Sequence, residues 1–402
     1  MKLLLPTSAP SLHRRHQIRS FVNAKVKWVR DPFLDKAIEK EKNLKQVLSL
    51  KSLIISHPSQ ILPIYKLTPL KPQLNLPITT LKFFQKYPLI FKVFQPPRKY
   101  SFPHVKVTSR IINLHNDEEL LVNLLSYRKD LAERLVKFLM LCRAMRVPLY
   151  VIDRFRFELG LPDNYLLNLL PEYPELFRIV DMGISGGGGD GDHVFGLELV
   201  RWRGDLAVSV MEKRAEQEGV RGRFIRFSMN LPRGFDLEKR VKDWEDEWQN
   251  LPYISPYEDA FHLAPNSDQA EKWAVAVIHE LLCLLVGKKA ERESVFCLGE
   301  YLGFGGRLKK AILHHPGIFY VSNKIRTQTV VLREAYTKNF LIEKHPLVSM
   351  RYKYIWLMNT VMRRGKPIRN IANVRRHKVP PHVISRRGNE VERRCIDNDG
   401  FD

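Results

Sequence analysis

The sequence lacks the cysteine spacing that is typical of metal-binding and disulfide-stabilised proteins. It has four cysteines, and no two of them are separated by two residues, as they are in a zinc-binding pair. Two of them lie in apolar stretches with helical spacing. We therefore expect buried, reduced thiols in a reducing compartment, and neither a zinc site nor a disulfide framework. The four are Cys142, Cys283, Cys297 and Cys395.

The sequence also lacks an apolar run long enough to cross a membrane. The longest candidate, residues 273–286, is interrupted by His279 and Glu280, and it is shorter than the roughly 20 residues that a bilayer requires. We interpret it as a core helix and expect no membrane partner. Hydrophobic residues still make up 44% of the 402 residues, so the chain is predicted to be globular, with room for two or three domains.

Acidic residues are absent from two long stretches of the chain. None precedes Asp31, and none occurs from residue 351 to residue 389, a segment with 11 Lys or Arg residues. The formal net charge is +23. Such an excess favours a polyanionic partner, nucleic acid before an anionic membrane surface. The alternative is that the charge serves only solubility.

The acid-free N-terminus has the composition of an organellar targeting segment. Residues 1–22 contain Arg14, Arg15 and Arg19 together with serines, and they lack the long apolar segment of a secretory signal. Because arginines outweigh hydroxyl residues in the stretch 13–21, we expect a mitochondrial transit peptide, with the chloroplast as the alternative destination. A basic arm that stays on the mature protein is the other interpretation.

One short phrase occurs three times and indicates how the chain is organised. An amphipathic run ends at a Tyr-Pro or His-Pro pair, a Phe follows three residues after the Pro, and a β-rich stretch begins there. Proline disfavours the helical conformation of the residue before it, so each helix should end at this pair. The Phe is expected to anchor the following strand in the core. The copies are Tyr87-Pro88 with Phe91, Tyr173-Pro174 with Phe177, and His315-Pro316 with Phe319.

Each copy has the predicted order helix, short helix, helix, strand, turn, strand. The first helices are predicted at 35–53, 117–144 and 268–285, and a Pro or Gly stands 11 or 12 residues before each repeated Pro. This order is typical of a winged helix-turn-helix, in which the last helix and the hairpin contact nucleic acid. We therefore predict an α+β, predominantly helical fold of tandem winged-helix-like units. Three unrelated helix ends that each carry a Pro are the alternative.

The three copies and the segments between them set the predicted boundaries. An acidic stretch that does not fit the repeat is interpreted as an insertion, and its helix is predicted to be solvated, with Trp244 and Trp248 on one face. A Gly-rich run, residues 183–192, lacks the Lys of a phosphate-binding loop and is predicted to be a hairpin tip. The boundaries are 1–22 for the transit peptide, 23–115, 116–202 and 266–350 for the first, second and third units, 203–265 for the insertion, and 351–402 for a basic C-terminal tail.

Basic residues on the last helices, the hairpins and the tail are the candidates for nucleic-acid contact. The last helix of the first and third copies is basic, whereas that of the second, residues 163–172, carries two acids and no base. We therefore expect the first and third units to bind phosphates, and the second to be structural or to pair with the others. The candidates are Lys82, Lys86, Arg98, Lys99, Lys106, Arg307, Lys309, Lys310, Lys324 and Arg326 in the units, and Arg351, Lys353, Arg363, Arg364, Arg375 and Arg376 in the tail.

Aromatic residues in or beside the basic hairpins are candidates for stacking on unpaired bases. Tyr100, Phe102 and Tyr320 have this position in the sequence. Core packing is the competing interpretation of each, because aromatic residues in β-rich stretches mostly pack against other side chains.

The sequence shows no convergent set of catalytic or metal-ligating residues. The acids of residues 243–247 are nearly contiguous, so they spread around a helix and do not converge. His314 and His315 precede a Pro at a helix end, where capping or packing explains them without a metal. We therefore expect a non-catalytic protein without a metal or cofactor. An RNA-processing nuclease and a DNA-binding winged-helix regulator are the alternatives.

Several phrases together resemble the plant organelle RNA recognition domain family. The similarity runs from about residue 27 to about residue 356, and it is carried by KWVRDPFLD at 27–35, LGLPDNY at 159–165, YPELF at 173–177, GIFYVS at 317–322 and HPLV at 345–348. The resemblance implies an RNA-binding protein of mitochondria or chloroplasts that promotes group II intron splicing by binding and folding the intron RNA. Because such introns are ribozymes, no catalysis by the protein is implied. Organellar intron RNA is the implied partner, other splicing factors are further candidates, and the oligomeric state stays open.

Overall fold

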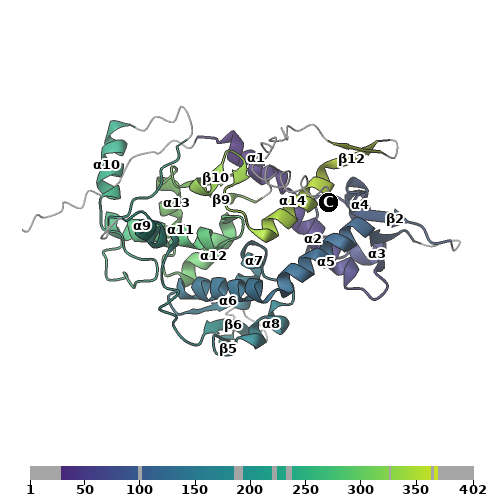
Figure 1. Ribbon diagram of the computed structural model, residues 1–402, viewed down its shortest axis with the longest axis horizontal. Helices are drawn as coiled ribbons and strands as arrows, with labels where there is room; N and C mark the ends of the chain where they lie inside the picture. Colours follow the sequence, from purple (N-terminus) through teal and green to yellow (C-terminus); the bar gives the residue numbers. More distant parts are fainter. Residues whose placement is uncertain are drawn as a thin grey trace, which may run out of the picture. The chain divides into compact units, whose positions relative to one another are not determined.

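Helices predominate over small antiparallel sheets in this α+β protein, as expected (Figure 1). The structure is a computed structural model that describes residues 29–97, 102–184, 193–219, 224–231, 238–325, 327–363 and 366–369. The chain divides at Met358 into two units. Of the second unit, the structure describes strands β12 (Thr360–Arg363) and β13 (Lys366–Arg369), which pair in an antiparallel hairpin. Within the described residues, no helix is both long and apolar enough to span a bilayer.

The same order of elements occurs three times in the first unit. A helix is followed by a short strand, a second helix, a third helix and a β-hairpin. The first copy consists of α2 (Leu44–Ile55), β1 (Ile61–Pro63), α3 (Ile64–Leu67), α4 (Thr80–Lys86), β2 (Phe91–Phe94) and β3 (His104–Val107). The second consists of α6 (Leu125–Met140), β4 (Arg146–Pro148), α7 (Leu149–Leu159), α8 (Tyr165–Asn168) with the 3-10 helix η1 (Leu170–Glu172), β5 (Phe177–Ile184) and β6 (His193–Leu199). The third consists of α11 (Asp268–Leu284), β7 (Lys289–Glu291), α12 (Arg292–Tyr301), α13 (Arg307–His314), β8 (Phe319–Ser322) and β9 (Thr329–Leu332).

Each copy builds a three-stranded antiparallel sheet with the same strand order. The short first strand pairs with the last strand of the hairpin, which gives β1-β3-β2, β4-β6-β5 and β7-β9-β8. The sequence pattern predicts the hairpins but not the short strands, because three residues are too few to show an alternating pattern. After the third copy, η2 (Arg333–Ala335) leads into a separate small hairpin of β10 (Tyr336–Thr337) and β11 (Phe340–Leu341).

The Tyr-Pro and His-Pro pairs end their helices as predicted, with nearly the same backbone geometry each time. Tyr87, Tyr173 and His315 have φ of −120°, −129° and −115° and ψ of 62°, 54° and 63°. In each copy the N–H of the following Phe donates to the carbonyl oxygen of this residue, at 3.0, 3.1 and 2.9 Å. The repeated phrase is therefore a helix-to-strand junction. Its anchoring side chains are all buried: Phe91, Phe177 and Phe319.

A second repeated feature lies one residue before each short strand. Gln60, Met145 and Lys288 adopt the left-handed conformation, with φ of 51°, 51° and 50°. Residues other than glycine rarely take this conformation. Because the three side chains have nothing in common, the sequence gives no signal for this turn.

Two of the predicted first helices are each broken once. The helix expected over 117–144 is split into α5 (Ser109–Asn123) and α6 at Leu124, whose ψ of 129° is extended. The helix expected over 35–53 is split into α1 (Pro32–Lys40) and α2 near Asn43, whose φ is 66°. Apolar spacing continues across both breaks, so periodicity alone does not reveal them.

The terminal helices of the first unit each pack against the copy that is farther away in sequence. Helix α14 (Pro346–Asn359) follows the third copy, yet Tyr354 and Ile355 belong to the hydrophobic core of the first copy. Helix α1 precedes the first copy, yet Leu34 and Ile38 pack on Tyr320 of the third sheet. The second and third copies share a single large core.

The segment between the second and third copies is packed into the protein. Its helices are α9 (Val210–Gln217) and α10 (Lys239–Gln249), and it contributes Phe227 and Trp248 to the core shared by the second and third copies. Trp244 and Trp248 share one face of α10 as predicted, with ring centroids 6.1 Å apart. However, Trp248 is only 1% exposed and stacks on His315 at 4.2 Å. The prediction of a solvated helix is therefore wrong for this face, although the opposite face is exposed.

The folded first unit extends beyond the expected start of the basic tail. Residues 351–359 belong to α14, in which Arg351, Tyr354 and Met358 are buried. The first unit ends at Met358, so the segment expected as a tail from residue 351 begins later. A stretch without acids is compatible with a core helix here, because its apolar and aromatic side chains face the first copy.

The buried-thiol prediction is confirmed for two of the cysteines. Cys142 and Cys283 are free and buried, and Cys297 is free and partly buried. Cys395 lies outside the described residues.

Candidate nucleic-acid interface

A groove on the third copy lies between its last helix and its hairpin. The groove has a volume of about 210 Å³, and α12, α13, β8 and the hairpin turn form its walls. Lys309 is exposed beside it, and Leu313 of the same helix is 54% exposed. The groove therefore joins the two elements that the sequence predicts as a nucleic-acid surface. Its lining residues are Arg292, Phe296, Lys309, Ile312, Leu313, Val321, Asn323 and Gln328.

Lys309 and Lys310 are the basic residues of α13 that face solvent. Both are exposed, and no carboxylate of the described residues lies within ion-pair distance of either. The helix is held from its other face by the buried Leu308 and Ile312. Arg307 is half-buried and donates to the carbonyl oxygen of Gly303 at 3.3 Å, so it is oriented back toward its own turn.

The first copy exposes the two lysines that the sequence predicts on its last helix. Lys82 and Lys86 are exposed on α4, whose opposite face is fixed by the buried Phe83 and Phe84. The Lys86 Nζ lies 5.4 Å from the centroid of the Tyr87 ring. Both ammonium groups can therefore reach a phosphate without disturbing the core.

The sheet of the first copy has a solvent-facing side that is both basic and aromatic. Lys92 pairs with Lys106, and Phe94 pairs with His104, so all four side chains lie on one face. The Lys106 Nζ lies 5.5 Å from the Phe94 ring centroid, and the Phe94 and His104 rings are 6.0 Å apart. We call these four residues the first sheet face. Of them, only Lys106 is a predicted candidate, although the alternation of polar and apolar residues along 91–94 and 104–107 carries the signal.

Two exposed aromatic rings stand beside the first sheet face. Tyr65 is 52% exposed, Phe102 is 62% exposed, and their ring centroids are 5.1 Å apart. Phe102 stands two residues before His104, the first residue of β3. Exposed aromatic rings interleaved with lysines are typical of surfaces that bind single-stranded nucleic acid.

The equivalent sheet positions differ in the other two copies. The place of Lys92 and Lys106 is taken in the second copy by Arg178 and Glu198, which form an ion pair at 2.6 Å. In the third copy it is taken by Tyr320 and Val331, which helix α1 covers. Of the three sheets, therefore, the first has the face that is open and basic.

Two predicted contact residues are corrected by their burial. Tyr320 is 1% exposed, and its hydroxyl donates to Asp35 at 2.8 Å, so it does not stack on bases. Arg351 is buried, its guanidinium lies 3.7 Å from the Phe157 ring centroid, and it donates to the Phe157 carbonyl oxygen. Burial lowers the pKa of Arg351. Lys353, on the same helix, is exposed and stays a candidate.

The structure describes two of the remaining predicted residues, Lys324 and Arg363. Lys324 is half-buried at the turn of the third hairpin. Arg363 lies in strand β12. The others lie outside the described residues: Arg98, Lys99, Tyr100, Arg326, Arg364, Arg375 and Arg376.

The two acids at the last helix of the second copy are both engaged by arginines. Asp163 pairs with Arg156 at 2.9 Å, and Glu172 pairs with Arg128 at 2.7 Å. Arg128 also donates to the carbonyl oxygen of Asn168. These contacts tie the last helix of the second copy to α6 and α7.

His314 and His315 have the packing role that their position indicates. Both bind the same oxygen of Glu271 on α11, each at 3.0 Å. Burial alone would raise the pKa of Glu271, but the two histidines lower it to about 2. The pair therefore fixes the end of α13 to α11.

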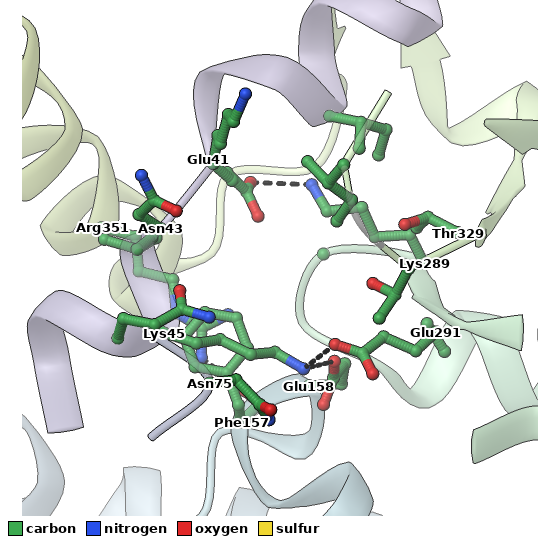
Figure 2. A pocket seen from close by; sticks show the side chains of 18 of the residues that line it. Glu41, Asn43, Lys45, Asn75, Phe157, Glu158, Lys289, Glu291, Thr329 and Arg351 are labelled. Atoms are coloured by element: carbon green, nitrogen blue, oxygen red, sulfur yellow. Dashed lines mark hydrogen bonds and ion pairs between the residues drawn. The ribbon is translucent and has the colours of Figure 1, made fainter. Parts of the chain in front are cut away.

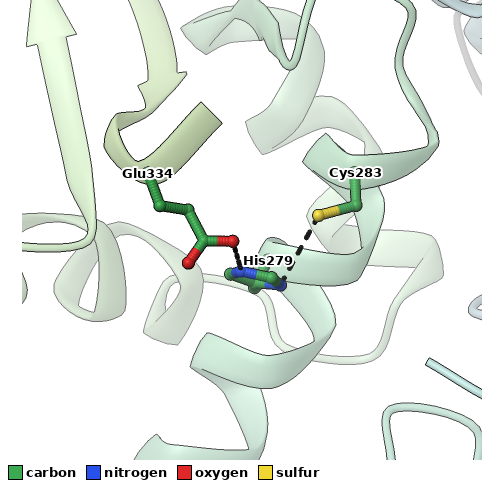
Figure 3. Close-up of side chains that lie close together, drawn as sticks. All are labelled: His279, Cys283 and Glu334. Carbon is green, nitrogen blue, oxygen red and sulfur yellow. Dashed lines mark hydrogen bonds and ion pairs between the residues drawn. The ribbon is translucent and has the colours of Figure 1, made fainter. Parts of the chain in front are cut away.

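A buried cluster of His279, Cys283 and Glu334 has the residue types of a metal site (Figure 3). The His279 Nε2 lies 2.9 Å from Glu334 Oε1, and its Nδ1 lies 3.7 Å from the Cys283 Sγ. Burial alone would lower the pKa of His279, but Cys283 and Glu334 raise it to about 10. A histidine that is protonated at neutral pH has no lone pair for a metal. Arg214 occupies the same Glu334 oxygen at 2.5 Å, so the cluster fits an ion-pair network better than a metal.

The sequence of the chain matches one protein-family model over most of the folded structure. The model is that of the plant organelle RNA recognition domain, and the match covers residues 29–363. The chain belongs to this family. The expected resemblance is thereby confirmed, and the match spans all three copies and α14. The first sheet face and the α13 groove both lie within it.

Several curated plant proteins are similar to the chain over most of its length. The mitochondrial protein WHAT'S THIS FACTOR 9 of Arabidopsis thaliana is 35% identical over 88% of this chain and 89% of its own length. The chloroplastic WHAT'S THIS FACTOR 1 homolog of Oryza sativa is 30% identical over 87% of this chain and 71% of its own length. ROOT PRIMORDIUM DEFECTIVE 1 of Arabidopsis thaliana is 31% identical over 84% of each chain. No solved structure matches the chain.

Proposed function

We propose that this chain is an organellar RNA-binding protein that promotes group II intron splicing by holding intron RNA in a competent fold, without chemistry of its own. Family membership supports the RNA part of the proposal. The observation that carries it is the first sheet face with its neighbouring exposed rings, because aromatic side chains beside lysines suit unpaired bases.

We infer that each copy acts as a winged-helix-like unit and that the first and third meet the RNA. Lys82 and Lys86 of α4 and Lys309 and Lys310 of α13 bind phosphates in this proposal. The second copy serves as a spacer, because arginines of neighbouring helices already engage the acids of its last helix. Other splicing factors of the ribonucleoprotein are further partners in this proposal.

The mitochondrion is the organelle that we propose. The mitochondrial relative is similar over 88% of this chain at 35% identity, and the chloroplastic relatives are 30–31% identical. The arginine-rich segment of residues 1–22 favours the same destination. The chloroplast is the alternative.

The enzymatic alternative has less support among the described residues. A nuclease needs carboxylates or histidines that converge on an open site. His314 and His315 are both held by Glu271, and His279 of the cluster with Cys283 and Glu334 is only 1% exposed. A DNA-binding regulator is the other alternative, and it is separated from the proposal by competition between intron RNA and duplex DNA of the same sequence.

The proposal is tested by recovering RNA bound to the protein in organelles. The tagged chain is immunoprecipitated from purified mitochondria and, separately, from chloroplasts, and the bound RNA is sequenced. We expect enrichment of group II intron RNA over exon and ribosomal RNA in one organelle, and accumulation of the same unspliced introns in a loss-of-function line. Recovery of no intron RNA in either organelle would overturn the proposal.

A further inference from the structure

The three copies meet at a cavity of about 410 Å³ (Figure 2). Side chains reach it from α2 in the first copy, from the end of α7 in the second, and from β7 and β9 in the third. Lys42, Gln73 and Asn75 at its edge are exposed, whereas Leu44 and Ala290 are buried. A cavity with a polar mouth and a closed inner wall is able to take a small organic group.

Two carboxylates in the cavity share one ammonium group. The Lys45 Nζ lies 2.7 Å from Glu158 Oε1 and 3.0 Å from Glu291 Oε1, and these contacts are drawn in Figure 2. On the other side of the cavity, Lys289 is paired with Glu41 at 2.7 Å. The buried guanidinium of Arg351 also lines the cavity, so the three carboxylates of Glu41, Glu158 and Glu291 lie among three cations, Lys45, Lys289 and Arg351.

The second oxygen of Glu158 has no hydrogen-bond partner. The residue is 7% exposed, and its Oε2 is buried and unpartnered among the described residues. A buried carboxylate oxygen without a donor is costly, because it loses its hydration and gains nothing in return. This oxygen therefore calls for an N–H or O–H donor from a molecule that enters the cavity.

A buried hydroxyl group from another copy also lacks a hydrogen-bond partner among the described residues. Thr329 of β9 lines the cavity, is 4% exposed, and has an unpartnered Oγ1 among the described residues. Its backbone pairs with Glu291 in the sheet, so its position is fixed. The cavity thus presents one acceptor, from the second copy, and one group that can donate or accept, from the third.

We propose that this cavity binds one unpaired RNA base that carries an exocyclic amino group, with Glu158 accepting from the amino group and Thr329 bonding to a neighbouring ring atom. The proposal rests on the RNA-binding function proposed above. Adenine, cytosine and guanine have such an amino group. Uracil has carbonyl oxygens on both sides of its single N–H, and these repel a carboxylate.

Other classes of ligand fit this corner less well. An ionised phosphate has no hydrogen to donate to the unpartnered Glu158 oxygen, and Lys45 is already paired with both carboxylates. A metal ion would lie next to the Lys45 ammonium, which already occupies the space between the two carboxylates. A neutral amino group needs only the unpartnered oxygen and leaves the Lys45 contacts in place.

The experiment compares the full chain and its variants on single-stranded oligo(A), oligo(C) and oligo(U) of equal length. We expect the unmodified chain to bind oligo(A) and oligo(C) about tenfold more tightly than oligo(U), the value of one well-formed hydrogen bond to a charged group. Thr329→Val and Glu158→Gln should bring this ratio toward one and leave the affinity for oligo(U) unchanged. Because Thr329→Val removes an unpartnered hydroxyl without changing volume, its melting temperature should not fall.

Thr80→Val is the matched control. The Thr80 hydroxyl is also unpartnered among the described residues and the side chain is 3% exposed, but it does not line the cavity. This variant should keep the full preference over oligo(U). If the unmodified chain does not discriminate among the oligonucleotides, or if both cavity variants keep the preference, the base site is wrong. A cavity filled by a basic side chain of a partner protein gives that same result, whereas failure to bind any of the three oligonucleotides would overturn the RNA-binding function itself.

Discussion

One sheet position is repeated in all three copies, but its side chain differs in exposure and in contacts from copy to copy, and the residue type accounts for the difference. Lys92 stays exposed opposite Lys106, Arg178 is neutralised by Glu198, and Tyr320 is covered by α1. The three backbones are equivalent there, because each residue directly follows the anchoring Phe. The chemistry of the surface therefore depends on side chains that the shared fold does not constrain.

Phe102→Ala is expected to weaken binding of single-stranded RNA without loss of stability. The ring is 62% exposed, so its removal costs little packing, whereas loss of one stacked base costs about 1–3 kcal/mol of binding free energy. Affinity measured by fluorescence anisotropy should fall about fivefold or more, with an unchanged melting temperature. Leu167→Ala, at an exposed apolar residue of α8, is the matched control and should bind as the unmodified chain does. Equal affinities for the two variants would contradict stacking at Phe102.

Glu271→Gln is expected to make the protein less stable than the unmodified chain at neutral pH. This difference in stability should become smaller as the pH falls. The folded-state pKa of Glu271 is lowered to about 2 by His314 and His315, against burial, which would raise it. Its stabilising contribution is therefore complete above its ordinary pKa of 4.5 and is lost as the pH falls toward 2. Thermal unfolding at pH 7 should show a loss of about 1–3 kcal/mol.

The difference between the Glu271→Gln variant and the unmodified chain should narrow between pH 4.5 and pH 2. Glu247→Gln, at an exposed position of α10, should change stability by less than about 0.5 kcal/mol at neutral pH. A stability difference for Glu271→Gln that stays constant with pH would show that the effect is not due to the carboxylate charge.

At the residue scale, the sequence indicates which basic and aromatic residues are candidates for RNA contact, but it does not show which of them are exposed. Lys309 and Lys310 are exposed as a basic helix surface requires, but Tyr320 and Arg351 are buried. Helix α1 covers Tyr320, and Arg351, on α14, is buried against Phe157 of the second copy; no local pattern reveals such contacts. Phe94 and His104 were not among the predicted candidates for the same reason, since only the pairing of β2 with β3 brings them together.

Among the elements, α13 is expected to contribute specifically to RNA affinity. Lys309→Glu with Lys310→Glu should lower affinity by about tenfold and make its salt dependence shallower, because two phosphate contacts are lost. Lys239→Glu with Lys242→Glu on α10 produces the same change in net charge at exposed residues of another helix. This control should have a much smaller effect. If both double variants lose affinity equally, binding follows bulk charge and α13 is not part of the site.

The sequence predicts the elements where local chemistry determines them. The three junctions at Tyr87, Tyr173 and His315 follow from the proline after each residue, and the hairpins follow from composition. The short strands and the left-handed residues before them were not predictable, because three residues carry no periodicity and Gln60, Met145 and Lys288 share no property.

For the whole molecule, folding and electrostatic attraction of RNA are expected to reside in different parts of the chain. The folded first unit ends at Met358, and the segment after residue 359 carries 11 Lys or Arg residues. A variant that ends at residue 359 keeps α14, so its circular dichroism and melting temperature should be unchanged. A variant that ends at residue 345 loses α14 with Tyr354 and Ile355, exposes the core of the first copy, and should unfold or aggregate.

RNA binding by the variant that ends at residue 359 should depend less steeply on salt than binding by the full chain. Each phosphate contact to single-stranded RNA contributes about 0.7 to the slope of log affinity against log salt, because bound counterions are released. Titrations at several salt concentrations give this slope directly. An unchanged slope would mean that the basic segment makes no phosphate contacts, and the attraction would then have to come from the lysines of α4, α13 and the first sheet face. A slope reduced by several contacts, with preserved discrimination among oligonucleotides, would assign affinity to the segment after residue 359 and base recognition to the folded unit.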